Sequence, residues 1–159
     1  MDKSCILMGI DSSTKNTGVS VYTNGILKRF ELLTEDNNDS QKRLENMIRR
    51  IYETISKYKP DIIAIETPTV CRNPQTQRQL TMIFGAIYGL SVDRDIFFKA
   101  YRPSEWRKYW KDTVMPRKRA ELKEWAIQKV KNEFGLEVSD DIAEAILIGG
   151  AYIKEYSER

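Results

Sequence analysis

Four acidic residues occupy positions at which a folded chain could bring them together. Asp11 and Glu66 each end a continuous apolar run, and buried strands of this kind carry ligands beyond their carboxyl ends. Asp141 and Glu144 open an apolar stretch three residues apart, so they share one face of a helix. Each has a simpler explanation by itself, since Asp closes turns and the Asp141–Glu144 spacing suits a capping box. Their recurrence at three element ends favours a shared site.

The side chains that are missing narrow the chemistry. The chain has no histidine, and Cys5 and Cys71 have neither metal-ligand nor disulfide spacing, which argues against zinc and against Ser-His or Cys-His nucleophiles. Carboxylates ~5 Å apart repel by about 3 kcal/mol per pair at an effective dielectric near 20, and hard cations relieve this repulsion. Oxygen ligands favour Mg²⁺ or Mn²⁺. We expect two Mg²⁺ per active site, with Mn²⁺ as a substitute, arranged for phosphodiester hydrolysis.

The segment 99–131 is the basic part of the chain, and aromatic residues are interleaved in it. Pro116 predicts a helix that starts there and stops at Gly135. Three cations would then lie in its first turn, where the helix dipole disfavours positive charge, and this indicates a bound phosphate. The alternative is a solvated run of charge. These cations are Arg117, Lys118 and Arg119.

The remaining pattern predicts an α/β sheet that positions the acids. Asn24-Gly25 is a strong hairpin signal between two strands. A helix capped by Ser40 and stopped by Pro60 would connect the two buried strands in parallel, which brings Asp11 and Glu66 to one edge. Strands are predicted over 5–11, 17–22, 26–33, 62–66 and 96–98, and helices over 40–58, 73–92, 116–134 and 139–156. We also expect Gly85 and Gly89 to let the second helix pack closely on the sheet.

Length and composition set the wider limits. A chain of 159 residues, 41% apolar and 31% charged, is typical of one domain, 1–159, with a sizeable core. The absence of a membrane-length apolar run and of a signal-peptide pattern predicts a cytoplasmic protein with no membrane partner. The net charge of +3 predicts only modest overall attraction to nucleic acid.

Three stretches resemble the acidic motifs of RuvC-type Holliday junction resolvases, in matching order and spacing. They are Gly9-Ile10-Asp11-Ser12-Ser13-Thr14-Lys15-Asn16-Thr17-Gly18, Ile63-Ala64-Ile65-Glu66 and Asp141-Ile142-Ala143-Glu144-Ala145. The resemblance implies an RNase H-like fold, a five-stranded mixed sheet with the second strand antiparallel, flanked by α-helices. It implies a homodimer that nicks opposing strands of a four-way DNA junction, leaving 5′-phosphate and 3′-hydroxyl ends. A phage-encoded member is expected.

The resemblance also implies roles for particular residues. The metal ligands and catalytic residues are Asp11, Glu66, Asp141 and Glu144, although Asp or His is commoner at the last position. Lys118 or Arg119 falls where the family has a basic residue that contacts the backbone phosphate. The aromatic that often follows the Glu66 position is replaced by Thr67-Pro68-Thr69-Val70, so forks and flaps join four-way junctions as expected substrates. The expected DNA-binding residues are Lys15, Arg72, Asn73, Arg102, Arg117, Lys118 and Arg119.

Two other functions fit parts of the pattern. An ATP-dependent phosphotransferase of the actin and sugar-kinase type has a similar first strand, but it needs two such domains around the nucleotide. A branched-nucleic-acid-binding module without catalysis would keep the fold, yet the presence of all four acids argues against it.

Overall fold

A five-stranded sheet lies at the centre of the computed structural model, which describes residues 4–158. Its strands are β1 (Ile6–Asp11), β2 (Asn16–Thr23), β3 (Ile26–Thr34), β4 (Ile62–Glu66) and β5 (Phe97–Tyr101). The strand order is β3-β2-β1-β4-β5; β2 pairs antiparallel with β1 and β3, whereas β1, β4 and β5 are parallel. Positive φ angles of 50° at Asn24 and 80° at Gly25 make the predicted hairpin turn. The predicted mixed sheet is confirmed.

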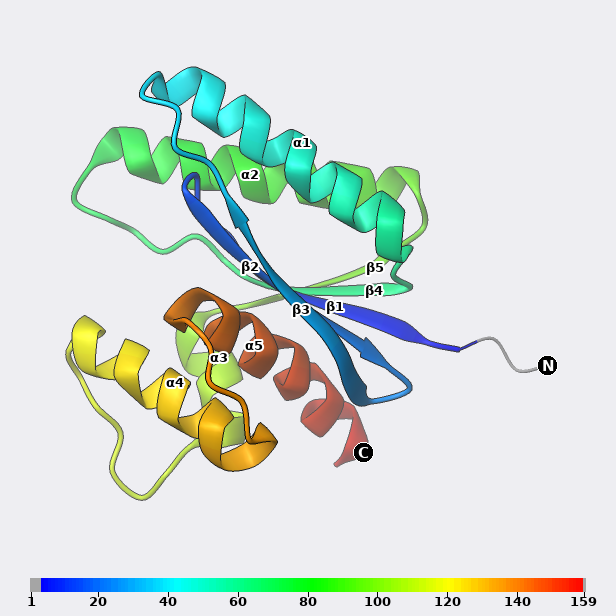
Figure 1. Cartoon of the computed structure of the whole chain (residues 1–159), viewed down its shortest axis with the longest axis vertical. Coiled ribbons are helices and arrows are strands. Elements are labelled where there is room, and N and C mark those ends of the chain that lie inside the picture. Colours follow the sequence, from blue (N-terminus) through cyan, green and yellow to red (C-terminus); the bar gives the residue numbers. More distant parts are fainter. Residues whose placement is uncertain (1–3, 159) are drawn as a thin grey trace.

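Helices cover both faces of this sheet (Figure 1). The helices are α1 (Ser40–Tyr58), α2 (Pro74–Asp93), α3 (Pro103–Arg107), the 3₁₀ turn η1 (Lys108–Trp110), α4 (Arg119–Phe134) and α5 (Asp140–Ser157). One face is covered by α1 and α2, and the other by α5, with α4 packed against α5. Among the described residues, no helix combines the length and the apolar character needed to cross a lipid bilayer.

The alternation of side chains along β1 explains why there are two cores. Met8 and Ile10 point to one face, where they pack with the apolar stripe of α1, including Met47 and Ile51. Leu7 points to the other face and joins the core formed by α5. Because β1 is covered on both faces, its side chains must be apolar on both. The strand is therefore a continuous apolar run that ends at Asp11.

Two glycines let α5 lie directly on the sheet. A Cβ added at Gly18 would come within 2.0 Å of the Asp141 carbonyl oxygen, and one added at Gly9 within 2.3 Å of the Ala145 carbonyl oxygen. Ser20 Oγ donates to that same Ala145 oxygen at 2.8 Å. The first turn of α5 is therefore held against the carboxyl end of β1.

Several predicted details are wrong. Asp39, rather than Ser40, caps α1, because its side chain accepts a hydrogen bond from the Lys42 amide. Gly85 and Gly89 do not pack on the sheet: nothing lies within 4 Å of a Cβ at either position. The fifth strand is not 96–98 but β5, because its pairing with β4 continues to the Glu66–Tyr101 pair.

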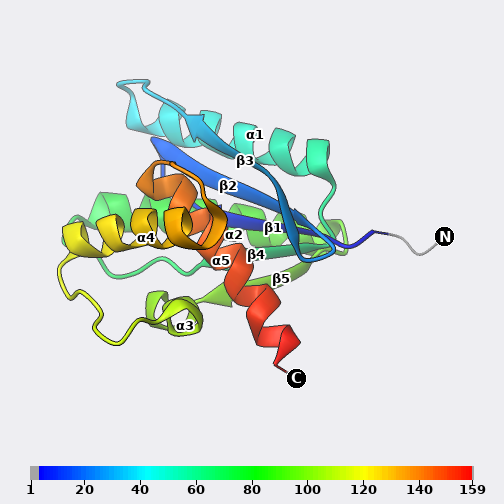
Figure 2. The same cartoon turned by 60° about the horizontal axis from the view of Figure 1, so that its bottom comes forward.

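The basic segment also differs from its prediction. The α4 helix begins at Arg119, so only this cation lies in its first turn; Lys118 is the extended N-cap and Arg117 precedes it in an irregular segment. The fully buried side chains of α4, Ala126 and Val130, lie further along the helix, where Trp125 and Ile127 also pack against the core. The short α3 helix was not predicted; it follows directly after β5 and lies away from α1 (Figure 2).

Candidate active site

The ends of three elements converge on one pocket. The Ile10–Ile65 pair aligns the carboxyl ends of β1 and β4, so Asp11 and Glu66 follow at neighbouring positions on one edge. The close approach of α5 at Gly18 brings Asp141 and Glu144 to the same edge. All four acids line a pocket of about 820 Å³, which we call the carboxylate pocket.

The carboxyl groups of this pocket influence one another's ionisation. Burial raises the pKa of Asp11 well above its ordinary value of 3.8, and the charges of Glu144, Glu66 and Asp141 raise it further. Burial also raises the pKa values of Glu66 and Asp141. In Glu144, burial and the charge of Glu66 raise the pKa, whereas a hydrogen bond with Asp11 opposes the rise. Clustered carboxyls with raised pKa values are typical of functional sites.

Two side chains from α3 hold the acids in place. The indole Nε1 of Trp106 donates a hydrogen bond to Glu66 Oε2 at 2.5 Å, and Trp106 is fully buried. The Arg107 guanidinium lies 4.7 Å from the centre of the Trp106 ring and places Nη2 3.7 Å from Glu144 Oε1. Arg107 therefore connects the indole that holds Glu66 with a second acid of the pocket.

The donor set suits a hard divalent cation. All four acids offer only oxygen, which Mg²⁺ and Mn²⁺ prefer, and their mutual repulsion would be relieved by positive charge. Within residues 4–158, no three His, Cys, Asp or Glu side chains are arranged to hold an ion as they stand. Trp106 bonds only one oxygen of Glu66, and Glu144 faces Arg107, so binding a metal requires side-chain movements that bring three carboxylates within reach of one ion.

The start of α5 distinguishes its acids. Ser139 is the N-cap, and its hydroxyl accepts a hydrogen bond from the Ile142 amide at 3.4 Å, so Asp141 does not cap the helix as the capping-box alternative required. Asp140 is engaged by Lys123, whose Nζ lies 2.5 Å from Asp140 Oδ2. Asp141 and Glu144 are thus left to face the pocket.

The predicted DNA-binding residues divide into three groups. Arg72, Asn73 and Arg119 line the carboxylate pocket, although the Asn73 side chain also caps α2 by accepting from the amides of Gln75 and Thr76. Arg102 lies outside this pocket and pairs with Glu105 at 2.9 Å.

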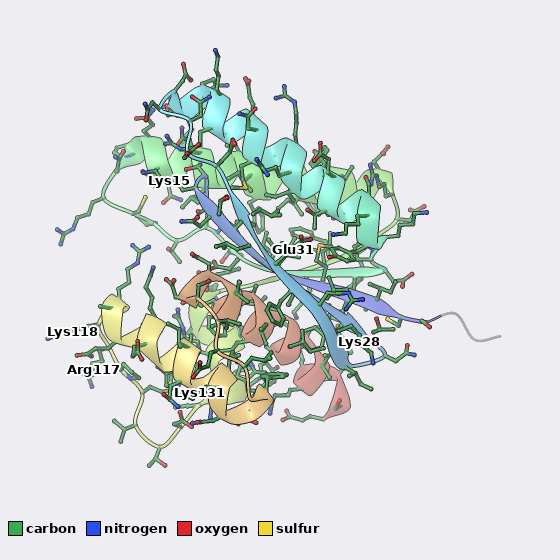
Figure 3. The ribbon with its side chains drawn as sticks, viewed as in Figure 1. Lys15, Lys28, Glu31, Arg117, Lys118 and Lys131 are labelled. Atoms are coloured by element: carbon green, nitrogen blue, oxygen red, sulfur yellow. The ribbon has the colours of Figure 1, made fainter. Side chains whose placement is uncertain are left out.

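The third group is exposed and does not line the carboxylate pocket. Lys15 lies in the turn after β1, and Arg117 and Lys118 precede α4. Figure 3 shows Lys15 on the α1–α2 side of the sheet and Arg117 and Lys118 on the α4 side, all toward the left of the view, where β1 ends. These cations therefore flank the edge that carries the carboxylate pocket.

Sequence reasoning missed Trp106, Arg107 and Lys123 as residues of the site. A signal for the first two was present: Pro103 suits the first position of a helix, and Glu105 suits the third position after an N-cap at Arg102. The Arg102 amide does donate to Glu105 Oε2 at 2.7 Å. Nothing in the local sequence indicated that α3 packs beside Glu66.

Comparisons with known proteins point in one direction. The family model described as "Crossover junction endodeoxyribonuclease RuvC" matches residues 7–147. A protein of that description from Prosthecochloris aestuarii is 29% identical over 107 residues, which cover 63% of this chain and 56% of the relative. One from Chlorobium phaeovibrioides is also 29% identical, over 106 residues. The chain thus spans just over half the length of the curated relatives that it matches.

Solved structures share the fold. Thermus thermophilus RuvC, in a complex with a Holliday junction substrate, superposes with a TM-score of 0.74 at 16% identity, covering 97% of this chain and 96% of that one. The yeast mitochondrial Holliday junction resolvase Ydc2 has a TM-score of 0.67 at 17% identity, covering 96% and 79%. At these identities the likeness shows the RNase H-like architecture.

Proposed function

Since the chain belongs to the RuvC family of crossover junction endodeoxyribonucleases, we propose that it is a divalent-metal-dependent endonuclease that cleaves four-way DNA junctions and other branched DNA. One observation carries the proposal. Four carboxyl groups from three elements line one pocket, where burial raises the pKa of each and the neighbouring acids raise the pKa of Asp11 further, and cations such as Arg107 and Arg119 line the same pocket. Carboxylates that hold cations, beside positive side chains that hold phosphate, are the groups that phosphodiester hydrolysis requires.

Asp11, Glu66, Asp141 and Glu144 would hold two Mg²⁺ ions, and Mn²⁺ would substitute. When bound, these ions activate a water molecule and stabilise the leaving 3′ oxygen, giving 5′-phosphate and 3′-hydroxyl ends. The side chains of the protein position the groups that react. Trp106 orients Glu66, and the hydrogen bond that it donates lowers the pKa of Glu66, which keeps the carboxylate available as a ligand.

Cations would position the DNA backbone. Arg107 and Arg119 face the acids and can contact the phosphate that is cleaved. Lys15, Arg117 and Lys118 are exposed around the pocket and would contact phosphates on either side of it. Phosphate contacts orient the DNA without reading its sequence. These contacts would therefore recognise branched DNA by the course of its backbone and not by its base sequence.

Symmetric cleavage of a junction requires two active sites, so the proposal includes a homodimer. We assign its interface to the exposed side of α2. Met82, Tyr88 and Val92 are 49%, 53% and 63% exposed there, and the open space at Gly85 and Gly89 would let a second helix approach closely. Exposed apolar side chains along one helix are typical of a surface that is covered in an assembly.

A cleavage assay tests the activity. Purified protein should nick a four-way junction in Mg²⁺ or Mn²⁺, with less cleavage of forks and flaps and none of linear duplex. Asp11→Asn and Glu66→Gln should each abolish cleavage while junction binding in gel-shift assays stays intact or tightens. Asp112→Asn is the matched control and should cleave normally, because Asp112 is an exposed acid between η1 and α4 that accepts hydrogen bonds from Trp125 and Lys129 and does not line the pocket.

The contrary result is also defined. A wild-type protein that binds junctions but never nicks them in either metal would be a binding module without catalysis. Micromolar binding of Mg-ATP in calorimetry would instead support the ATP-dependent phosphotransferase as the function.

A further inference from the structure

The start of α4 brings a cation to the carboxylate pocket but is weakly held by the helix itself. Arg119, the first residue of α4, lines the pocket, whereas the fully buried side chains of the helix begin at Ala126. Lys118 is the N-cap and makes no side-chain capping hydrogen bond. A helix end without a cap and without buried side chains opens easily. Another contact is therefore needed to hold Arg119 beside the acids.

One ion pair joins this part of α4 to the start of α5. Lys123 Nζ lies 2.5 Å from Asp140 Oδ2, and Asp140 directly precedes Asp141 in the first turn of α5. Lys123 also lines the carboxylate pocket. Within residues 4–158, no other side-chain hydrogen bond or ion pair connects residues 119–124 to the rest of the molecule.

The helical period places Lys123 on the same face of α4 as Arg119. The two residues are four positions apart, about one turn, and the same stripe continues to Ala126 and Val130, which are fully buried. Packing in the core fixes the direction of this face in the second half of α4. The ion pair with Asp140 extends this constraint to the first half.

Arg119 lies within electrostatic reach of the acids but has no partner of its own. Burial raises the pKa of Glu66, and the Trp106 hydrogen bond and the charges of Arg107 and Arg119 oppose that rise. Among the described residues, Arg119 makes neither a hydrogen bond nor an ion pair, so its guanidinium is available for a bidentate contact with phosphate oxygens. Its place in the pocket is therefore set by the helix that carries it.

We propose that Lys123 is a positioning residue for cleavage: its pairing with Asp140 fixes the start of α4, so that Arg119 stays within reach of the phosphate that is cleaved. The inference rests on the proposed function and deepens it. A partly exposed ion pair contributes little to overall stability. Misplacing a group at the reacting phosphate by ~1 Å, in contrast, can slow a reaction roughly 100-fold. The pair should therefore affect the cleavage rate far more than the stability.

Single-turnover cleavage of a four-way junction, at saturating protein and Mg²⁺, measures this role. Lys123→Met should slow cleavage at least about tenfold, while junction affinity and melting temperature stay close to those of the wild type. Asp140→Asn should slow cleavage equally, although it leaves the cation of Lys123 in place. The double variant should be no slower than either single variant, because both changes break the same pair.

Further variants show that the effect passes through Arg119. In an Arg119→Gln background, Lys123→Met should cause no further loss, because the residue that it positions is absent. Lys123→Arg can still pair with Asp140 and should restore most of the rate. Lys131→Met is the matched control: Lys131 pairs with Glu137 at 2.9 Å, lies outside the pocket and is far along α4 from Lys118 (Figure 3). This control should cleave at the wild-type rate.

Each contrary result has its own meaning. If Lys123→Met is slow but Asp140→Asn is as fast as the wild type, Lys123 acts on the DNA directly and the positioning role is wrong. The role is also wrong if Lys123→Met slows the Arg119→Gln protein as much as the wild type, or if its melting temperature falls together with its rate. In all these cases the wild type still nicks junctions, so the proposed function stands. A wild type that never nicks them overturns the proposed function and this inference with it.

Discussion

At the scale of single residues, Asp11 shows how the carboxylate pocket lowers the stability of the metal-free fold. Burial and three neighbouring acids raise its pKa above 3.8 in the folded chain. The folded state therefore binds more protons than the unfolded state, and stability falls as pH rises from about 4 through the folded-state pKa. The metal-free protein should accordingly lose stability toward neutral pH from this cluster, and a divalent cation should restore it.

Asp11→Asn should raise the melting temperature of the metal-free protein at pH 7.5 by at least about 2–4 °C, the shift for 1 kcal/mol in a domain of this size. The gain should shrink near pH 4, where the wild-type carboxyl is protonated. Mg²⁺ should raise the melting temperature of the wild type but not of the variant, as measured by scanning calorimetry. An equal Mg²⁺ response in both proteins would show that Asp11 is not a ligand.

Trp106→Phe should show that Trp106 orients Glu66 for cleavage and does not contribute to junction binding. The substitution removes the hydrogen bond to Glu66, and because this bond lowers the pKa of Glu66, its loss should raise that pKa further. Cleavage should fall by roughly 10–100-fold, as for other changes behind a ligand, and its pH profile should move to higher pH while junction affinity is retained. A pH profile that merely drops in height would indicate a purely structural role for the indole.

At the scale of elements, the contact between α5 and the sheet determines whether the acids meet. Gly18→Ala would push a Cβ to 2.0 Å from the Asp141 carbonyl oxygen, so α5 must move away from β1. We expect a loss of at least about 3 kcal/mol of stability together with the Mg²⁺-induced thermal shift. Ser20→Ala, which removes only a hydrogen bond to α5, should cost about 1 kcal/mol and keep the Mg²⁺ response.

The start of α4 gives a prediction about DNA affinity. Arg119 lines the carboxylate pocket, whereas Arg117 and Lys118, which precede the helix, do not. Replacing Arg117 and Lys118 by Gln should weaken binding to all DNA sequences alike and reduce the salt slope by ~2, with little effect on cleavage at saturating protein. Arg119→Gln should reduce cleavage itself. An unchanged salt slope for the double variant would show that Arg117 and Lys118 do not contact DNA phosphates.

These elements also show what the sequence could and could not predict. The apolar runs of β1 and β4, the Asn24-Gly25 turn and the stripe of α1 are local patterns. The β2–β3 hairpin and the edge that carries Asp11 and Glu66 followed from them, whereas the five-stranded mixed sheet was implied by the resemblance to the resolvases. The start of α4 and the α3 helix depend on distant contacts, because Trp106 and Trp110 are buried by packing against α4 and α5. The role of Arg107 was hidden for that reason.

At the scale of the whole molecule, paired cleavage should depend on dimerisation through α2. Tyr88→Glu should give a monomer in light scattering, because it puts a charge into the proposed apolar interface. On a supercoiled plasmid with an extruded cruciform, the variant should produce nicked circles where the wild type produces linear DNA. Ile26→Glu, at an apolar residue that is 60% exposed in the β2–β3 hairpin, should leave the dimer intact. A Tyr88→Glu protein that remains dimeric would show that the interface does not lie on α2.

The central claim is that acids from β1, β4 and α5 share divalent ions. Its most direct test is anomalous diffraction from crystals of the protein soaked in Mn²⁺. We predict anomalous peaks inside the carboxylate pocket, within coordination distance of Asp11, Glu66 and at least one of Asp141 and Glu144. Mn²⁺ bound only elsewhere on the surface, with all four carboxylates unliganded, would contradict the account.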